Sequence, residues 1–82
     1  MPTREDFAKY INSRISQMQT DFIDLNSGEI HRVLGHYPGT NHRMPVCCEV
    51  MYEKMNGDDK VLYAPPKGNG ATLKIRYFRK NH

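Results

Sequence analysis

The last third of the chain constrains its fold most strongly, because two β-type segments there flank a loop rich in glycine and proline. Residues 71–78, ATLKIRYF, alternate apolar and polar side chains, and residues 60–64, KVLYA, form a shorter run. Such alternation is typical of a strand with one buried face. The loop between them, residues 65–70, reads PPKGNG. The sequence therefore predicts a β-hairpin whose inward-facing residues are Leu73, Ile75, Tyr77, Val61 and Tyr63.

A helix and a small strand are predicted at the start of the chain. Residues 3–18 begin at a capping threonine, Thr3, with acidic residues in the first turn. Apolar residues recur there at three-and-four spacing, which predicts one face packed on the core. This stripe comprises Phe7, Tyr10, Ile11, Ile15 and Met18. A short apolar run over residues 22–25 then predicts a strand beside the later hairpin.

Two shorter helices are predicted in the middle of the chain. The first follows a cap at Asn26 or Ser27 and ends at Gly35, which suits the left-handed position after a helix. Its predicted inward face is Ile30, Val33 and Leu34. The connection over residues 36–41 contains Pro38 and Gly39, a pair typical of a type II turn.

The next helix is predicted from Met44 or Pro45 to about Met55, since proline is tolerated in a first turn. Its predicted buried face holds Cys47, Val50, Met51 and Met55. Its predicted exposed face holds Cys48, Glu49, Tyr52 and Glu53.

The predicted order is therefore helix, strand, helix, helix, strand, loop, strand, in one α+β domain over residues 1–82. Within it, 1–20 hold the first helix, 22–78 the remaining elements, and 79–82 a basic tail. This order resembles the winged helix-turn-helix class of DNA-binding domains. Two segments of the sequence are similar to a small uncharacterised bacterial family sometimes found beside restriction-type nuclease domains. They are GEIHRVLGHYPGTNHRMPVCCEVM and YAPPKGNGATLKIRYF. The resemblance implies a DNA-contacting accessory module or regulator of a bacterial or phage system.

Charge is distributed unevenly along the chain. Residues 60–82 carry six Lys or Arg and no Asp or Glu, whereas the first 59 residues carry six basic and nine acidic side chains. This concentrates positive potential on the predicted hairpin and favours an anionic partner. The alternative is that a basic tail only keeps a small protein soluble.

The sequence predicts a double-stranded DNA interface at the start of the third helix and on the hairpin. A helix N-terminus offers free N–H groups to a phosphate, and loop glycines allow close approach to a backbone. The candidate nucleic-acid-binding residues are Asn41, His42, Arg43, Lys67, Asn69, Lys74 and Arg76. For Lys74 and Arg76 on the last strand, a solvated face is the alternative to a phosphate track.

Two other partners compete with duplex DNA. A protein partner or second copy is the first, and its candidate apolar patch is Tyr37, Met44, Cys48 and Tyr52. Single-stranded or structured RNA is the other, and it is less favoured because the hairpin lacks an obvious row of exposed aromatic residues.

Catalytic and metal sites are not predicted, although three histidines and two thiols lie between residues 31 and 48. Zinc sites favour separated cysteines, whereas Cys47 and Cys48 are adjacent. We therefore expect no enzyme activity, metal or cofactor. No stretch approaches the ~20 apolar residues of a membrane span, and the cysteine usage fits a reducing compartment. The sequence predicts a cytoplasmic protein without membrane contact.

Overall fold

The structure, a computed structural model, describes residues 3–35, 44–66 and 70–79. Its elements are α1 (Arg4–Ser16), β1 (Phe22–Asn26), α2 (Ser27–Leu34), α3 (Met44–Glu53), β2 (Lys60–Tyr63) and β3 (Lys74–Phe78). The α+β class and the order of helices and strands are thus confirmed. The turn predicted at Pro38 and Gly39 lies outside the described residues.

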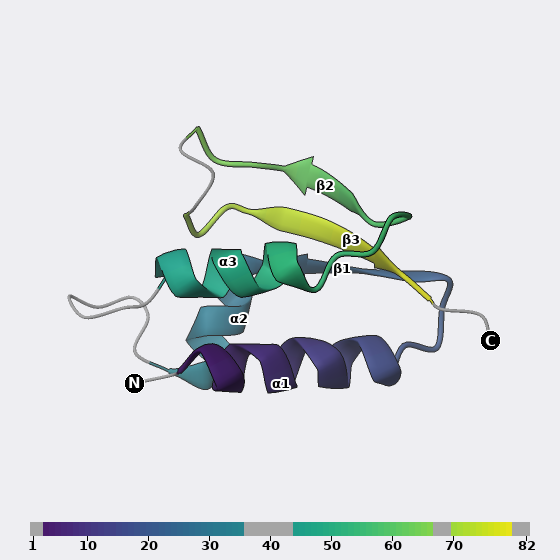
Figure 1. The fold of residues 1–82 in the computed structure, drawn as a ribbon, viewed down its shortest axis with the longest axis horizontal. Helices are drawn as coiled ribbons and strands as arrows, with labels where there is room; N and C mark the ends of the chain where they lie inside the picture. The colour runs from purple at the N-terminus through teal and green to yellow at the C-terminus, as the bar shows by residue number, and fades with distance from the viewer. Residues whose placement is uncertain (1–2, 36–43, 67–69, 80–82) are drawn as a thin grey trace.

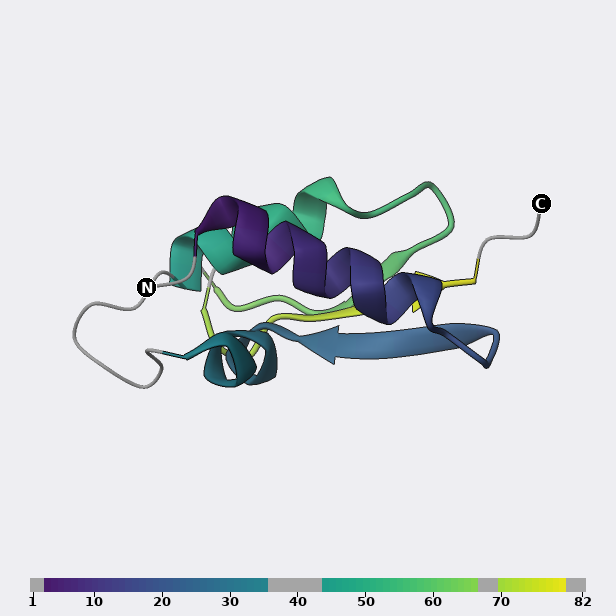
Figure 2. The ribbon, with the colours of Figure 1, turned by 90° about the horizontal axis from the view of Figure 1, so that it is seen from below.

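The three strands form one antiparallel sheet in the order β1-β3-β2 (Figure 1). β1 runs along the whole of β3, with Phe22 opposite Phe78 and Asn26 opposite Lys74. The predicted pairing of the first strand beside the hairpin is therefore confirmed. Figure 2 shows α1 and α3 on the same side of the sheet, so one face of the sheet contributes to the core.

Helix α1 begins where its capping residues dictate. The Thr3 hydroxyl accepts a hydrogen bond from the Asp6 N–H at 3.2 Å, and the Asp6 carboxylate accepts one from the Thr3 N–H at 2.9 Å. This reciprocal arrangement satisfies two backbone donors and lowers the pKa of Asp6. Phe7 and Ile11 of the predicted stripe are fully buried, and its other members pack against the core edge.

Helix α2 is capped by Asn26, whose side chain accepts from the Glu29 N–H at 3.1 Å. The predicted inward face is wrong at Val33, which is 63% exposed, while His31 is fully buried. The N-terminal residues of α2 explain this orientation: Ser27 packs into the core, and His31 shares its face one turn later.

The buried His31 closes the C-terminal end of α2. Its Nδ1 lies 3.0 Å from the Gly35 carbonyl oxygen, so Nδ1–H donates to that oxygen. Its ring meets the Phe7 ring edge-on at 5.2 Å between centroids. Gly35 has a φ of 101°, a positive value as expected at this position.

The core lies between the helices and the covered face of the sheet. Its buried apolar members are Phe7, Ile11, Leu25, Ile30, Met44, Cys47, Cys48, Val50, Met51, Leu73, Ile75 and Tyr77. The prediction for Leu73, Ile75 and Tyr77 is confirmed, and each is fully buried.

The prediction that Tyr63 faces inward is wrong, since Tyr63 is 54% exposed. Val61 shares the helix-facing side of the sheet with its partner Ile75, but it is 39% exposed because β2 is the edge strand and extends beyond the helices (Figure 1). Val61 pairs with Ile75, but a bulge at Leu62 then places Tyr63 opposite Lys74. Without that extra residue Tyr63 would stand opposite Leu73, on the helix side.

The Tyr77 hydroxyl donates a hydrogen bond to the Met51 carbonyl at 2.8 Å inside the core, and removing this hydroxyl tests the packing of β3 against α3. That carbonyl lies in the last turn of α3, where helical partners are missing. We expect Tyr77→Phe to lower the free energy of unfolding by about 1 kcal/mol. Tyr63→Phe is the matched control, because Tyr63 is exposed. Urea denaturation of both variants measures the difference, and equal stabilities would contradict the assigned role.

Candidate nucleic-acid interface

The structure describes two of the seven predicted contact residues and the chain on either side of the other five. Asn41, His42 and Arg43 lie outside the described residues, directly before Met44, the first residue of α3. Lys67 and Asn69 also lie outside them, in the segment between Pro66 and Gly70. The geometry of the interface is therefore built from the points where these segments join the fold.

Gly70, the residue at which the hairpin loop returns to the fold, is held by side chains of α2 and α3. The Cys48 Sγ accepts from the Gly70 N–H at 3.3 Å, and the Ser27 hydroxyl donates to the Gly70 carbonyl at 2.5 Å. The return of the hairpin loop is thus fixed beside the first half of α3. In Figure 1 it lies at the end of the molecule where α3 begins.

Residues 71–73 continue this contact along the start of α2. The Ser27 N–H donates to the Leu73 carbonyl at 2.9 Å, and the Gly28 N–H donates to the Ala71 carbonyl at 3.1 Å. The alternation predicted a strand that begins at Ala71, whereas β3 begins at Lys74. These bonds explain the difference, because they pair the backbone of residues 71–73 with α2. They also satisfy two N–H groups at the start of α2 that have no helical partner. We call the contacts of Gly70–Leu73 with Ser27, Gly28 and Cys48 the hairpin junction.

The hairpin junction buries Cys48, so its predicted place on the exposed face of α3 is wrong. Cys48 is 1% exposed, because Gly70 lies directly against its sulfur. Burial raises its pKa, while hydrogen bonds with Gly70 and Ser27 oppose that rise. Burial raises the pKa of Cys47 to about 12. Both thiols are therefore poor nucleophiles near neutral pH, since the thiolate is the reactive form.

The acidic residues on the exposed face of α3 are paired with a cation. Arg4 of α1 donates to the carboxylates of Glu49 at 2.5 Å and Glu53 at 2.8 Å. These bonds raise the pKa of Arg4, Glu49 contributing most. The guanidinium offsets one of the two negative charges that α3 would present to a polyanion.

Lys74 and Arg76 lie on the face of the sheet away from the helices. They alternate with the buried Ile75 and Tyr77, so their side chains leave the opposite surface of β3. Arg76 donates twice to Asp24 of β1, at 2.8 and 3.1 Å, whereas Lys74 is exposed. The structure does not bring this pair together with the start of α3.

The apolar patch predicted for a protein partner is wrong at two of its four residues, which are buried. Met44 and Cys48 are 3% and 1% exposed and belong to the core, while Tyr52 is 36% exposed. Tyr37, its remaining member, lies outside the described residues.

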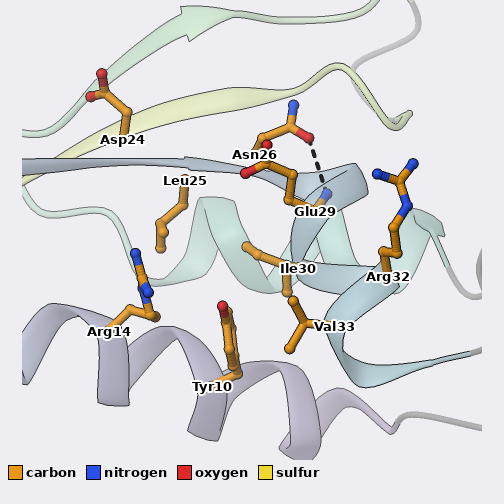
Figure 3. Close-up of a pocket in the computed structure, with 9 residues that line it drawn as sticks. All are labelled: Tyr10, Arg14, Asp24, Leu25, Asn26, Glu29, Ile30, Arg32 and Val33. Carbon is orange, nitrogen blue, oxygen red and sulfur yellow. Dashed lines mark hydrogen bonds between the residues drawn. The ribbon is translucent and has the colours of Figure 1, made fainter.

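An open groove of about 440 Å³ lies between α1, α2 and β1 (Figure 3). Leu25 and Ile30 point into it from β1 and α2, and Tyr10 and Arg14 rise from α1. The other residues along it are Asp24, Asn26, Glu29, Arg32 and Val33. It contains no predicted contact residue and neither of the buried thiols, so it is separate from the hairpin junction.

Within residues 3–35, 44–66 and 70–79, no three His, Cys, Asp or Glu side chains are grouped to hold a metal ion. In those same ranges, no helix has both the length and the apolar composition needed to cross a bilayer.

Comparisons with protein-family models, with curated proteins and with solved structures give no match to this chain. The candidate interface therefore stands on geometry and charge alone.

A substitution at Gly28 tests the hairpin junction, because a Cβ there would lie 2.8 Å from the Ala71 carbonyl oxygen. Relieving that contact requires a shift of the junction, and we expect Gly28→Ala to destabilise the fold by about 1 to 3 kcal/mol. Gly57→Ala is the matched control, since nothing lies within 4 Å of a Cβ at that position. Chemical denaturation compares the two variants. Equal stability of both would show that the close approach of Gly28 to Ala71 is not required.

Proposed function

We propose that this chain is a non-enzymatic module that binds double-stranded DNA in the manner of a winged helix-turn-helix domain. The start of α3 and the loop between β2 and β3 are the contacting parts. The observation that carries the proposal is the hairpin junction, in which Gly70 is bonded to Cys48 of α3 and Ser27 of α2. The hairpin junction thereby fixes the end of the hairpin loop relative to α3.

The arrangement of the elements supports this proposal. A domain of this kind presents one helix to the major groove while other parts contact the flanking backbone. Here α2 precedes α3, and the hairpin formed by β2 and β3 returns beside α3 at Gly70. A sheet in the order β1-β3-β2, covered by helices on one face, holds these parts in place.

The distribution of charge supports the same partner. In the sequence, Arg43 directly precedes Met44, the first residue of α3, and Lys67 lies three residues before Gly70 of the hairpin junction. Asn41, His42 and Asn69 add hydrogen-bonding groups to these two segments. Glu49 and Glu53 are the opposing charges on α3, and Arg4 pairs with both. In this proposal Lys74 and Arg76 lie apart from the helix end.

A salt titration tests the proposal. Each phosphate neutralised by a cation adds roughly −0.9 to the slope of log affinity against log salt. We expect Arg43→Ala and Lys67→Ala each to make the slope shallower by about 0.9, measured by fluorescence anisotropy with a random-sequence duplex. Lys9→Ala is the matched control, since Lys9 is an exposed cation of α1. Absence of duplex binding at low salt, or equal slopes for all variants, would refute the proposal.

Arg43→Glu separates this function from a protein-binding role. Charge reversal beside the start of α3 is expected to abolish duplex binding, because it places a carboxylate against a phosphate. Association with a protein partner through another surface would persist in that variant.

A substitution at Arg4 tests the role of charge further, because Arg4 forms ion pairs with two carboxylates on α3 and offsets part of their negative charge. We expect Arg4→Ala to weaken duplex binding, most strongly at low salt, since Glu49 and Glu53 would then repel the DNA backbone. Arg14→Ala removes an exposed cation near the other end of α1 and serves as the control. Anisotropy titrations at two salt concentrations measure both variants. An equal loss in the two variants would mean that only net charge matters.

A further inference from the structure

The face of the sheet away from the helices carries three aromatic residues in a basic setting. Antiparallel partners share a face, and the register gives it three rows across the strands. The first row is Phe22 and Phe78, the second is Asp24, Arg76 and Lys60, and the third is Asn26, Lys74 and Tyr63. We call these eight residues the open face. The helices α1 and α3 lie on the other side of the sheet (Figure 2).

The sequence of the hairpin alone does not predict the aromatic residues of the open face. The hairpin contributes Phe78, while β1 brings Phe22 next to it, with ring centroids 6.0 Å apart. The bulge at Leu62 then turns Tyr63 to the same face, where it is 54% exposed. The three strands thus bring three aromatic residues to one face, the exposed Phe22 and Tyr63 and the half-buried Phe78.

Arg76 forms a rigid flat surface in the middle of the open face. Its guanidinium carbon lies 4.0 Å from the centroid of the Phe22 ring, and the two hydrogen bonds that Arg76 donates to Asp24 fix its plane. Asp24 raises the pKa of Arg76, and Arg76 lowers that of Asp24, so both groups stay charged. Guanidinium planes and aromatic rings are the groups on which unpaired bases stack in proteins.

The remaining charges on the open face favour a polyanion. Asp24 is neutralised by Arg76. The exposed Lys60 of β2 lies in the same row as this pair, and the exposed Lys74 of β3 lies in the next row. No further carboxylate belongs to the eight residues of the open face, although Asp21 and Asp58 line a hollow at one end of it together with Lys60, Phe78 and the cation Arg79. A phosphate path is therefore favoured along Lys60 and Lys74, toward Tyr63.

We propose that the open face binds a single-stranded nucleic acid. Bases stack on Tyr63 and on the plane of Arg76 over Phe22, and phosphates contact Lys60 and Lys74. A single strand is the occupant that uses both features, because its bases are free to lie on rings while its backbone meets the lysines. The bases of a duplex are stacked on each other, so their faces are not free to lie on these rings. This site is distinct from the proposed duplex interface and does not depend on it.

Anisotropy with a labelled single strand of about 12 nucleotides, as DNA and as RNA, tests the proposal. We expect Tyr63→Ala to weaken binding by about tenfold through the loss of one stacked base. Tyr63→Phe keeps the ring and is expected to keep the affinity. Tyr52→Ala is the matched control, since it removes an exposed aromatic residue from α3. The difference between the DNA and RNA arms identifies which sugar the site accepts.

Two further arms separate the base and phosphate contributions. An abasic strand of equal length keeps the phosphates and is expected to bind Tyr63→Ala and the native protein equally. Lys60→Ala combined with Lys74→Ala is expected to make the salt slope shallower by about 1.4, using the slope for single strands. Lys9→Ala is the control for charge.

The outcomes distinguish this site from the duplex interface. The proposal predicts that Arg43→Glu loses duplex binding and keeps single-strand binding, whereas Tyr63→Ala weakens only the single strand. Lack of single-strand binding at low salt overturns the proposal for the open face alone. So does an affinity that Tyr63→Ala leaves unchanged while Arg43→Glu or Lys67→Ala removes it, because the strand would then occupy the helix end.

Discussion

The hydrogen bonds between Gly70 and the side chains of Ser27 and Cys48 are the contact on which the rest of the architecture depends. They join the end of the hairpin loop to two helices that are distant in sequence. Gly28 allows this approach, because its missing Cβ leaves room for the Ala71 carbonyl. The junction therefore sets the rotation of α2, the burial of Cys48 and the point at which β3 begins.

The junction also explains how polar and reactive side chains serve the fold. Cys48 exchanges hydrogen bonds with Gly70, and His31 closes the end of α2 against Phe7. In the described parts of the chain, every fully buried side-chain nitrogen or oxygen has a hydrogen-bond partner. This is what a small domain requires, because an unpaired buried polar group costs a large share of its modest stability. Thiols and a histidine that resemble reactive groups in the sequence are structural groups here.

The two surfaces that we propose for nucleic acids balance their charges differently. At the helix end, Arg4 from α1 pairs with the carboxylates of Glu49 and Glu53 on α3, which offsets part of their negative charge. On the open face, Arg76 is itself paired with Asp24 and lies over the Phe22 ring, with lysines beside it. The proposed duplex and single-strand sites thus differ in chemistry as well as in place.

Local patterns in the sequence determined the elements: the caps at Thr3 and Asn26, the alternation of β3 and the order of helices and strands were all predictable. The positively charged hairpin segment was also evident, since it follows from composition. Tertiary structure alone decided which surfaces those elements expose. Tyr63 faces solvent because a bulge shifts its register, and Cys48 is buried because a loop from a distant part of the chain covers it. Such pairings depend on contacts between remote segments, and local periodicity carries no information about them.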